Sequence, residues 1–438
     1  MKRFAICAVT LLAVSSAFAQ SVDPMIDREM PSLLATYKQL HAAPELSMNE
    51  KNTSALLAAR LREFGYEVTY PVGRYATPGA TAYGVVAVMK NGTGPTVLVR
   101  SDMDALPVVE ETALPYASTV RSKNATGEDV GVMHACGHDI HMTTLMGTAK
   151  ILAQTKDRWH GTLILVGQPA EEVVKGAGAM LNDRLYERFG RPSFVVALHD
   201  SANLEAGKIG YTPGYYMASA DSVNLTVRGL GGHGASPQST RDPIVLASQI
   251  VLALQTIVSR ENSPLDPVVV TVGSIHGGTK RNIIPNEVQL LLTVRTYKPD
   301  VRKRVLASIE RIAKGLALAA GVPENLAPVM EQLPDESIGS TYNDPALTER
   351  LAAALKPVLG AGNVIKMDPL MVSEDVNLFS LDKQIPLAMF SLGAVDPALM
   401  GSGKPLPSLH SSRFAPLPEP TIRAGVKGMT AMVWELMK

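Results

Sequence analysis

The sequence is poor in cysteine, with two residues in 438. Cys7 lies in an N-terminal segment with a basic start, a short apolar run and the small residues Ala17-Phe18-Ala19, which are typical of a cleaved signal peptide. We therefore expect residues 1–19 to be removed and the mature chain to be exported, into a periplasm or the medium. Cys136 is then the only thiol, so an intramolecular disulfide is excluded. A redox function, which needs a resolving cysteine, is disfavoured.

Long apolar runs and an excess of charge of one sign are also lacking. A membrane span needs about 20 apolar residues, and no later stretch is expected to provide one. Lysine plus arginine and aspartate plus glutamate both number 41, without long runs of either sign. These absences argue against a nucleic acid, or a membrane after signal cleavage, as a partner. Because the length exceeds what one hydrophobic core usually holds, two domains are expected.

The densest group of metal-binding side chains is Met133–His141, which holds a thiol, three imidazoles and a carboxylate. A buried, inert thiol is the ordinary alternative for a lone cysteine, but the surrounding histidines favour a ligand or a nucleophile. Cys136 and His138 are two residues apart, so their side chains face the same way in an extended segment. A helix expected to begin near Asp139 would favour the thiolate at its N-terminus.

Three fully apolar strands are each followed by acids or a histidine. The strands and the polar residues after them are Thr96–Val99 with Asp102 and Asp104, Thr162–Val166 with Glu171 and Glu172, and Phe194–Leu198 with His199. Such strands are typical of a mostly parallel sheet covered on both faces, whose sites lie along the carboxyl edge of the sheet. The fold class is therefore predicted to be α/β, with a composite site at that edge.

Glu172 and His199 can complete a metal site with Cys136 and His138. Mixed sulfur, nitrogen and oxygen ligands suit zinc, with manganese, cobalt and nickel as alternatives. Glu171 can then serve as a general base beside a water whose pKa the metal lowers from about 15.7 to about 7. The simpler alternative for an acidic pair is a solvated surface.

Asp102 and Asp104 have two interpretations. They are either cap and turn residues or carboxylates that orient a ligand histidine; for Asp104 the second is favoured. His41, before Ala43-Pro44-Glu45, is expected to be a surface or helix-end residue.

Residues 218–337 are predicted to form a separate module. Strand and helix patterns follow the order βαββαβ, which is typical of a ferredoxin-like domain. We predict that it is inserted into a first domain formed by residues 20–217 and 338–438. His233 lies in a glycine-rich loop of the module, where loop composition and ligand contact explain it equally well.

Seven sequence blocks resemble, in order, those of a known family. They are Ser101–Pro107, Met133–Asp139, Gln168–Glu172, Leu198-His199, Gly231-Gly232-His233, Asn282–Pro285 and Leu409-His410-Ser411. The family comprises the two-metal amidohydrolases of the hippurate hydrolase, N-acyl-amino-acid amidohydrolase and IAA-amino acid hydrolase type, relatives of aminoacylase and carboxypeptidase G. The resemblance covers nearly the whole mature chain, and the cysteine block combined with the glutamate pair is highly specific.

The resemblance implies two divalent metal ions per subunit. The residues that match the family's ligands are Cys136, His138, Glu172, His199 and His410. Glu171 matches the general base, which moves a proton from the metal-bound water to the leaving amine. Asp104 matches an aspartate that orients a ligand histidine. Because Asp102 stands where the relatives have that histidine, the partner of Asp104 is left open.

The resemblance also implies a metallopeptidase catalytic domain with a lid that mediates dimerisation and closes over the substrate. His233 matches a lid histidine that reaches the partner's site and stabilises an oxyanion. Asn282 and Arg295 match lid residues that hold the substrate carbonyl and its α-carboxylate. Two positions depart from close relatives, which commonly have histidine where this chain has Gln238 and glycine where it has Ile140.

The residues and the resemblance together predict an exported, homodimeric, metal-dependent amidohydrolase that acts on linear amides. The expected reaction is hydrolysis of N-acyl or N-aroyl amino acids, hippurate-like molecules, to a carboxylic acid and a free amino acid. A dipeptidase or carboxypeptidase with the same site is the nearest alternative. A periplasmic binding protein for amino-acid conjugates that has lost turnover is an alternative from another class.

Overall fold

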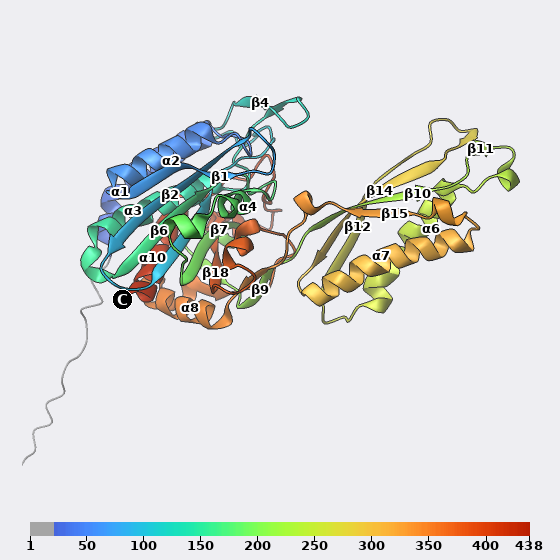
Figure 1. Cartoon of the computed structure of the whole chain (residues 1–438). Helices are drawn as coiled ribbons and strands as arrows, with labels where there is room; N and C mark the ends of the chain where they lie inside the picture. The colour runs from blue at the N-terminus through green and yellow to red at the C-terminus, as the bar shows by residue number, and fades with distance from the viewer. Residues whose placement is uncertain (1–21) are drawn as a thin grey trace, which may run out of the picture.

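The computed structural model describes residues 22–438 and shows a large and a small lobe (Figure 1). The predicted signal peptide lies outside the described residues. The large lobe contains an eight-stranded sheet in the order β1-β2-β6-β3-β7-β18-β8-β17. Its strands are β1 Glu67–Arg74, β2 Thr81–Asn91, β3 Thr96–Asp102, β6 Gly161–Gln168, β7 Phe194–Glu205, β8 Ile209–Tyr211, β17 Val364–Lys366 and β18 Leu387–Val395.

Four neighbouring strands in the middle of this sheet, β6, β3, β7 and β18, run parallel to one another. Strands β2 and β1 continue the sheet antiparallel on one side, and β8 pairs antiparallel with β18 on the other. Because β3, β6 and β7 run in the same direction, the polar residues after their apolar parts meet at one edge. The predicted α/β class is confirmed.

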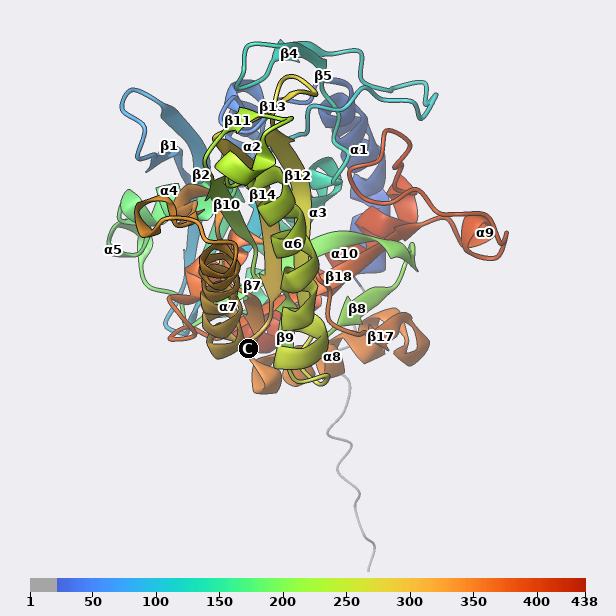
Figure 2. The ribbon, with the colours of Figure 1, turned by 90° about the vertical axis from the view of Figure 1, so that its right-hand side faces the viewer.

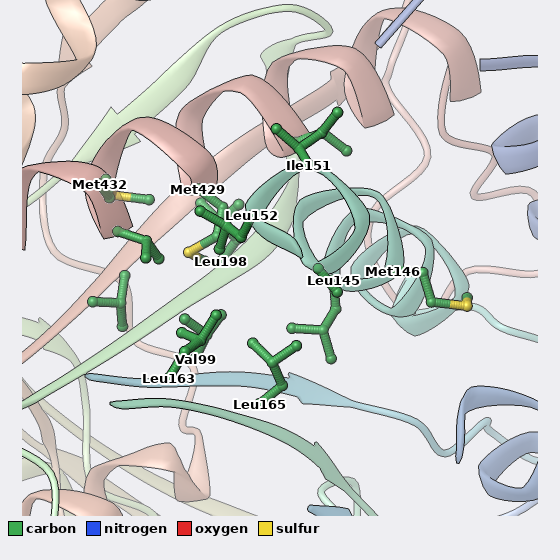
Figure 3. Close-up of a cluster of buried hydrophobic side chains, with 14 of the residues drawn as sticks. Val99, Leu145, Met146, Ile151, Leu152, Leu163, Leu165, Leu198, Met429 and Met432 are labelled. Atoms are coloured by element: carbon green, nitrogen blue, oxygen red, sulfur yellow. The ribbon is translucent and has the colours of Figure 1, made fainter. Parts of the chain in front are cut away.

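Helices cover both faces of the sheet. On one face lie α1 Asp23–Ala42, α2 Lys51–Glu63, α3 His138–Gln154, α8 Pro345–Leu359 and α10 Pro418–Met437, and on the other α4 Gly176–Asn182, α5 Leu185–Phe189 and the 3-10 helix η7 Asp375–Ser380. Alternate strand residues contribute to the two layers: Val97 and Val99 pack in one core cluster and Leu98 in the other. Figure 3 shows Val99 in the first layer, beneath α3 and α10.

The small lobe is a four-stranded antiparallel sheet with two helices packed on it (Figures 1 and 2). In chain order its main elements are β10 Asp221–Arg228, α6 Pro243–Thr256, β12 Val268–Gly277, β14 Glu287–Thr296, α7 Pro299–Ala319 and β15 Val329–Gln332. Their sequence is βαββαβ and the sheet order is β12-β14-β10-β15, the arrangement expected for a ferredoxin-like module. Its role as a lid stays a prediction.

Short strand pairs complete the structure. Strands β9 Gly214–Met217 and β16 Thr341–Asn343 pair where the chain leaves and re-enters the large lobe. The pair β11 Gly232–His233 and β13 Ile283–Ile284 lies at the end of the small lobe that is distant from the large one (Figure 1). The hairpin of β4 Arg121–Lys123 and β5 Asp129–Gly131 projects from the large lobe.

One helical stretch of the described residues corrects a sequence expectation. Pro243–Glu261 is long and apolar enough to cross a membrane by length and composition, with a mean hydropathy of 1.4. One face of this stretch, including Leu246, Ile250 and Leu254, packs in the small-lobe core. Its other face carries apolar side chains that are exposed, Leu252 among them at 73%. The expectation that no later stretch could provide a span is therefore wrong on composition.

Candidate metal centre

Cys136 and His138 flank Gly137 in a tight turn at the start of α3. Gly137 has φ +75°, and a Cβ at this position would lie 1.9 Å from Oδ2 of Asp200, so the turn requires glycine. His138 is the first residue of α3, and both it and Cys136 are buried. The turn therefore places a thiol and an imidazole side by side at the carboxyl edge of the sheet.

Three further donors come from distant parts of the chain. Glu172 lies on the loop after β6, and His199 lies within β7. His410 comes from the segment between β18 and α10, where its N–H donates to the carbonyl of Ala135 over 2.8 Å. That backbone bond ties the C-terminal segment to the cysteine turn, which explains how so late a histidine reaches the centre.

The donor atoms converge around the thiol. Sγ of Cys136 lies 3.3 Å from Nε2 of His410 and 3.6 Å from Nε2 of His199. The Glu172 carboxylate lies 3.4 Å from Nε2 of His410 and 3.8 Å from Nε2 of His138. All five predicted ligands are thus brought together, with Cys136 and Glu172 each beside two of the histidines.

Hydrogen bonds and charges at Nδ1 turn the histidine rings toward this point. Nδ1–H of His199 donates to the carbonyl of Asp200 over 2.8 Å, which leaves Nε2 free to ligate. Nδ1 of His138 lies 3.4 Å from Oδ1 of Asp104. His138 is therefore the partner of Asp104 that the sequence left open.

Asp102 and His141 form a separate pair beside the centre. Nδ1 of His141 lies 2.5 Å from Oδ1 of Asp102, and its Nε2 lies 2.8 Å from the backbone nitrogen and 3.2 Å from Oδ1 of Asp200. Asp102 also accepts from Arg100 over 2.6 Å. Both ring nitrogens of His141 already have partners. Asp102 and His141 therefore stabilise the cysteine turn rather than supply a further metal ligand. Oxygen and nitrogen atoms of Asp102, His138, His141 and His199 nevertheless form a cluster that could hold a cation.

The electrostatics of the centre fit divalent cations. Burial, followed by the charges of Glu172 and Asp200, raises the pKa of the Cys136 thiol well above its usual range. Burial also raises the pKa of Glu172 to about 7, against an opposing effect of His138. Nε2 of His138 and Oε1 of Glu172 are buried without a hydrogen-bond partner. Buried anionic groups, and buried polar atoms without a hydrogen-bond partner, are costly unless a nearby cation compensates them.

Glu171 lies beside this donor set. It is buried, and one of its carboxylate oxygens belongs to a cluster with His138 and Glu172. Burial, followed by the charges of Glu374 and Glu172, raises the pKa of Glu171 well above its usual range. Both glutamates thus lie at the donor set, but their other neighbours differ: Glu171 also clusters with Glu374 and Asp375, whereas Glu172 also clusters with Cys136 and His410.

The predicted small-lobe residues are split between its two ends. His233 belongs to β11, and the N–H of Gly234 donates to the carbonyl of Asn282 over 2.8 Å, so His233 and Asn282 lie together at the distant end. Arg295, at the end of β14, instead donates to Oγ of Ser373 in the large lobe over 3.1 Å. The chain thus brings Arg295 to its own large lobe but holds the other two away from it.

Sequence reasoning missed a buried ionic network next to Glu171. The Arg100 guanidinium donates to Glu374 over 2.7 Å and to Gln168 over 2.9 Å, and Gln168 donates to Asp375 over 2.6 Å. A signal was present, because Glu374-Asp375 is an acidic pair of the kind that drew attention to Glu171 and Glu172.

His41 is the second of its two predicted alternatives, a helix-end residue. It lies in the last turn of α1 and is fully buried rather than at the surface. Its ring nitrogens face Asp139 at 2.7 Å and Glu110 at 3.0 Å.

The large lobe is an α/β fold with parallel central strands, and it holds this donor set and the glutamate pair at the carboxyl edge of its sheet. This is the architecture of a metal-dependent hydrolase of amide or peptide bonds. Comparison with known proteins agrees. A family model described as Peptidase family M20/M25/M40 matches residues 98–435. This match spans most of the chain, so the chain belongs to that family.

Individual relatives are consistent with the assignment. The chain is 37% identical over 348 residues to the hippurate hydrolase of Campylobacter jejuni, covering 78% of this chain and 83% of that protein. It is 34% identical over 358 residues to thermostable carboxypeptidase 1 of Saccharolobus solfataricus, covering 81% and 84%. A dinuclear metal-binding M20 peptidase from Bacillus subtilis superposes with a TM-score of 0.74 at 26% identity, covering 94% of this chain and 99% of that one.

Proposed function

We propose that this chain hydrolyses the amide bond of N-acyl or N-aroyl amino acids, releasing a carboxylic acid and a free amino acid. The observation that carries the proposal is the pair of adjacent glutamates at the candidate ligands. Glu172 lies 3.4 Å from the candidate ligand His410, whereas Glu171 clusters with His138 on one side and with Glu374 and Asp375 on the other. A relative that is 37% identical is named for hippurate hydrolysis, which supports an acylated amino acid as the substrate.

Two divalent cations per subunit are part of the proposal, with zinc first and manganese, cobalt or nickel as alternatives. Their proposed ligands are Cys136, His138, Glu172, His199 and His410. When bound, such ions polarise an amide carbonyl and acidify a water molecule.

The protein's own contribution to the reaction is proton transfer and orientation. Glu171 takes a proton from the attacking water and delivers it to the amide nitrogen, so that the amine can leave. Its burial keeps competing water away from that proton. Asp104 holds the ring of His138, and Arg295 is suited to the substrate's α-carboxylate, since a guanidinium binds carboxylates with two parallel hydrogen bonds.

A homodimer through the small lobe completes the proposal. His233 and Asn282 lie at the end of the small lobe distant from their own metal centre. We therefore propose that both act at the metal centre of a second subunit. Exposed apolar side chains on the same lobe, including Leu252 at 73% and Leu265 at 90%, offer surface for that contact. His233 would stabilise the oxyanion in the partner's site, and Asn282 would hold the substrate carbonyl.

Export of the mature chain stays a proposal, tested by the N-terminal mass of protein recovered from a periplasmic fraction.

A dipeptidase or carboxypeptidase is the second candidate, favoured by the 34% identical relative named as a carboxypeptidase. The discriminating experiment measures metal content and hydrolysis of hippurate, N-acetyl amino acids and dipeptides in parallel, for wild type and Glu171→Gln. Preference for acylated amino acids, lost in the variant, supports the proposal. Preference for dipeptides favours the second candidate, and tight ligand binding without product in wild type favours a binding protein.

A further inference from the structure

The turn between α1 and α2 holds the backbone around Glu171 and Glu172, directly and through Asp104. Oγ of Ser47 donates to Oδ2 of Asp104 over 2.6 Å, and the same oxygen accepts the N–H of Glu172 over 3.0 Å. Oε1 of Glu50 accepts the N–H of Ala170 over 2.7 Å and that of Met48 over 2.8 Å. The turn therefore fixes the backbone on both sides of Glu171.

The backbone held by Glu50 is unusual. Ala170 has φ +51°, a left-handed conformation that residues other than glycine seldom adopt, and it directly precedes Glu171. We call Ala170–Gly176 the base loop. Inside it, the N–H groups of Lys175 and Gly176 donate to the carbonyl of Ala170 over 3.0 and 3.1 Å. Those bonds close the loop on itself, whereas the bonds from Ala170 to Glu50 and from Glu172 to Asp104 tie the loop to the rest of the protein.

Capping of α2 does not account for Glu50. Glu50 is the N-cap residue, yet its side chain makes no capping hydrogen bond. That task falls to Glu45, whose carboxylate accepts the N–H groups of Asn52 over 2.9 Å and Thr53 over 2.7 Å. Glu50 is fully buried, and burying a carboxyl group is costly unless its partners repay the cost.

We propose that Glu50 is a positioning residue for catalysis: its carboxyl group fixes the N–H of Ala170 and thereby the place of Glu171 beside the metal centre. The inference rests on the proposed function of Glu171. Glu50 acts by accepting a hydrogen bond rather than through its charge. Burial, followed by the nearby Asp104, raises the pKa of Glu50 to about 8, so glutamine resembles the form present at neutral pH.

The test compares wild type with Glu50→Ala, Glu50→Asp and Glu50→Gln, and uses Glu45→Ala as the matched loss of a carboxylate from the same turn. Misplacing a catalytic group by about 1 Å costs on the order of a hundredfold in rate. We expect kcat to fall by about ten- to a hundredfold in Glu50→Ala and Glu50→Asp, with KM changed less than about threefold. Glu50→Gln should restore most of kcat, and Glu45→Ala should lower stability without this loss.

Hydrogen–deuterium exchange of a peptide covering residues 168–176 supplies a readout besides activity. Exchange should accelerate in Glu50→Ala and Glu50→Asp but not in Glu50→Gln or Glu45→Ala, with metal content preserved. Glu50→Asp keeps the carboxylate on a side chain that is one methylene group shorter, which withdraws it from Ala170. This variant therefore tests the contact even if Glu50→Ala does not fold. Unchanged exchange and kcat in Glu50→Asp, an equal loss of kcat in Glu45→Ala, or failure of Glu50→Gln to restore it would overturn the inference. If wild type hydrolyses no amide, the proposed function fails, while the exchange data still test the contact.

Discussion

Oδ1 of Asp104 lies 3.4 Å from Nδ1 of His138, on the side of the ring opposite the metal centre. The other oxygen of Asp104 accepts the N–H of Glu172 over 3.0 Å. One carboxylate thus faces the imidazole of one proposed ligand and fixes the backbone of another.

Asp104→Ala should therefore weaken metal binding without removing any ligand. Loss of a group that orients a ligand typically costs about 10- to 100-fold in metal affinity, and we expect a loss in this range. Competition with a chelator measures the affinity. Asp129→Ala, which removes a surface carboxylate paired with Arg121, serves as the control and should leave the affinity unchanged. Equal affinities in wild type and Asp104→Ala would show that His138 is oriented by other contacts.

Cys136 is a proposed ligand whose sulfur lies beside two other proposed ligands, His410 and His199. Cys136→Ala should reduce the metal content below that of wild type, since a ligand is lost. Cys136→Asp should retain more metal, because a carboxylate can also ligate the metal. Elemental analysis after gel filtration measures the content. A metal content equal to that of wild type in Cys136→Ala would contradict the proposed ligand role.

The buried contact of His41 with Asp139 and Glu110 makes stability depend on pH. Burial lowers the pKa of His41, but the hydrogen bonds to Asp139 and Glu110 outweigh this effect and raise it to about 10. The folded state therefore holds a proton that the unfolded state releases near pH 6.5. Its contribution to stability is complete below about pH 6.5 and is lost as the pH rises toward 10.

Wild type should consequently lose more stability than His41→Asn between pH 7 and pH 10. The difference in unfolding free energy between the two should shrink by up to about 1.4 kcal/mol per pH unit in this interval. Chemical denaturation at a fixed protein concentration measures it. A difference that stays constant or widens with pH would show that His41 is not protonated in the folded state.

If His233 acts in the partner's site, two inactive variants should complement each other. In a mixed dimer of Glu171→Gln with His233→Ala, one site has an intact base and receives an intact histidine. Random exchange of subunits should restore about a quarter of wild-type activity, since half of the dimers are mixed and each has one complete site. Mixing Glu171→Gln with Cys136→Ala is the control, because both defects lie in the large lobe. No recovery in the first mixture would place His233 outside the partner's site.

The large-lobe fold was accessible from sequence because its signals are local, and so was the expectation that Cys136, His138, Glu172 and His199 meet; His410 joined this set only through the family resemblance. Three apolar strands each ended in acids or a histidine, and Cys136 and His138 were separated by a single residue. Contacts that join distant segments left no such mark. Glu50 and Ala170 are 120 residues apart in the chain, and the charged partners that bury His41 lie 69 and 98 residues away. Burial of a polar group depends on those partners, so it could not be predicted from its own neighbourhood.

In the proposed reaction Glu171 moves the proton while other residues hold the metal. The most direct test of this step is turnover of the best N-acyl amino acid substrate by Glu171→Gln, with metal content measured on the same sample. A general base contributes about a hundred- to ten-thousandfold to the rate, so kcat should fall by that factor while two ions per chain remain. Turnover close to wild type with the metals retained would contradict the account.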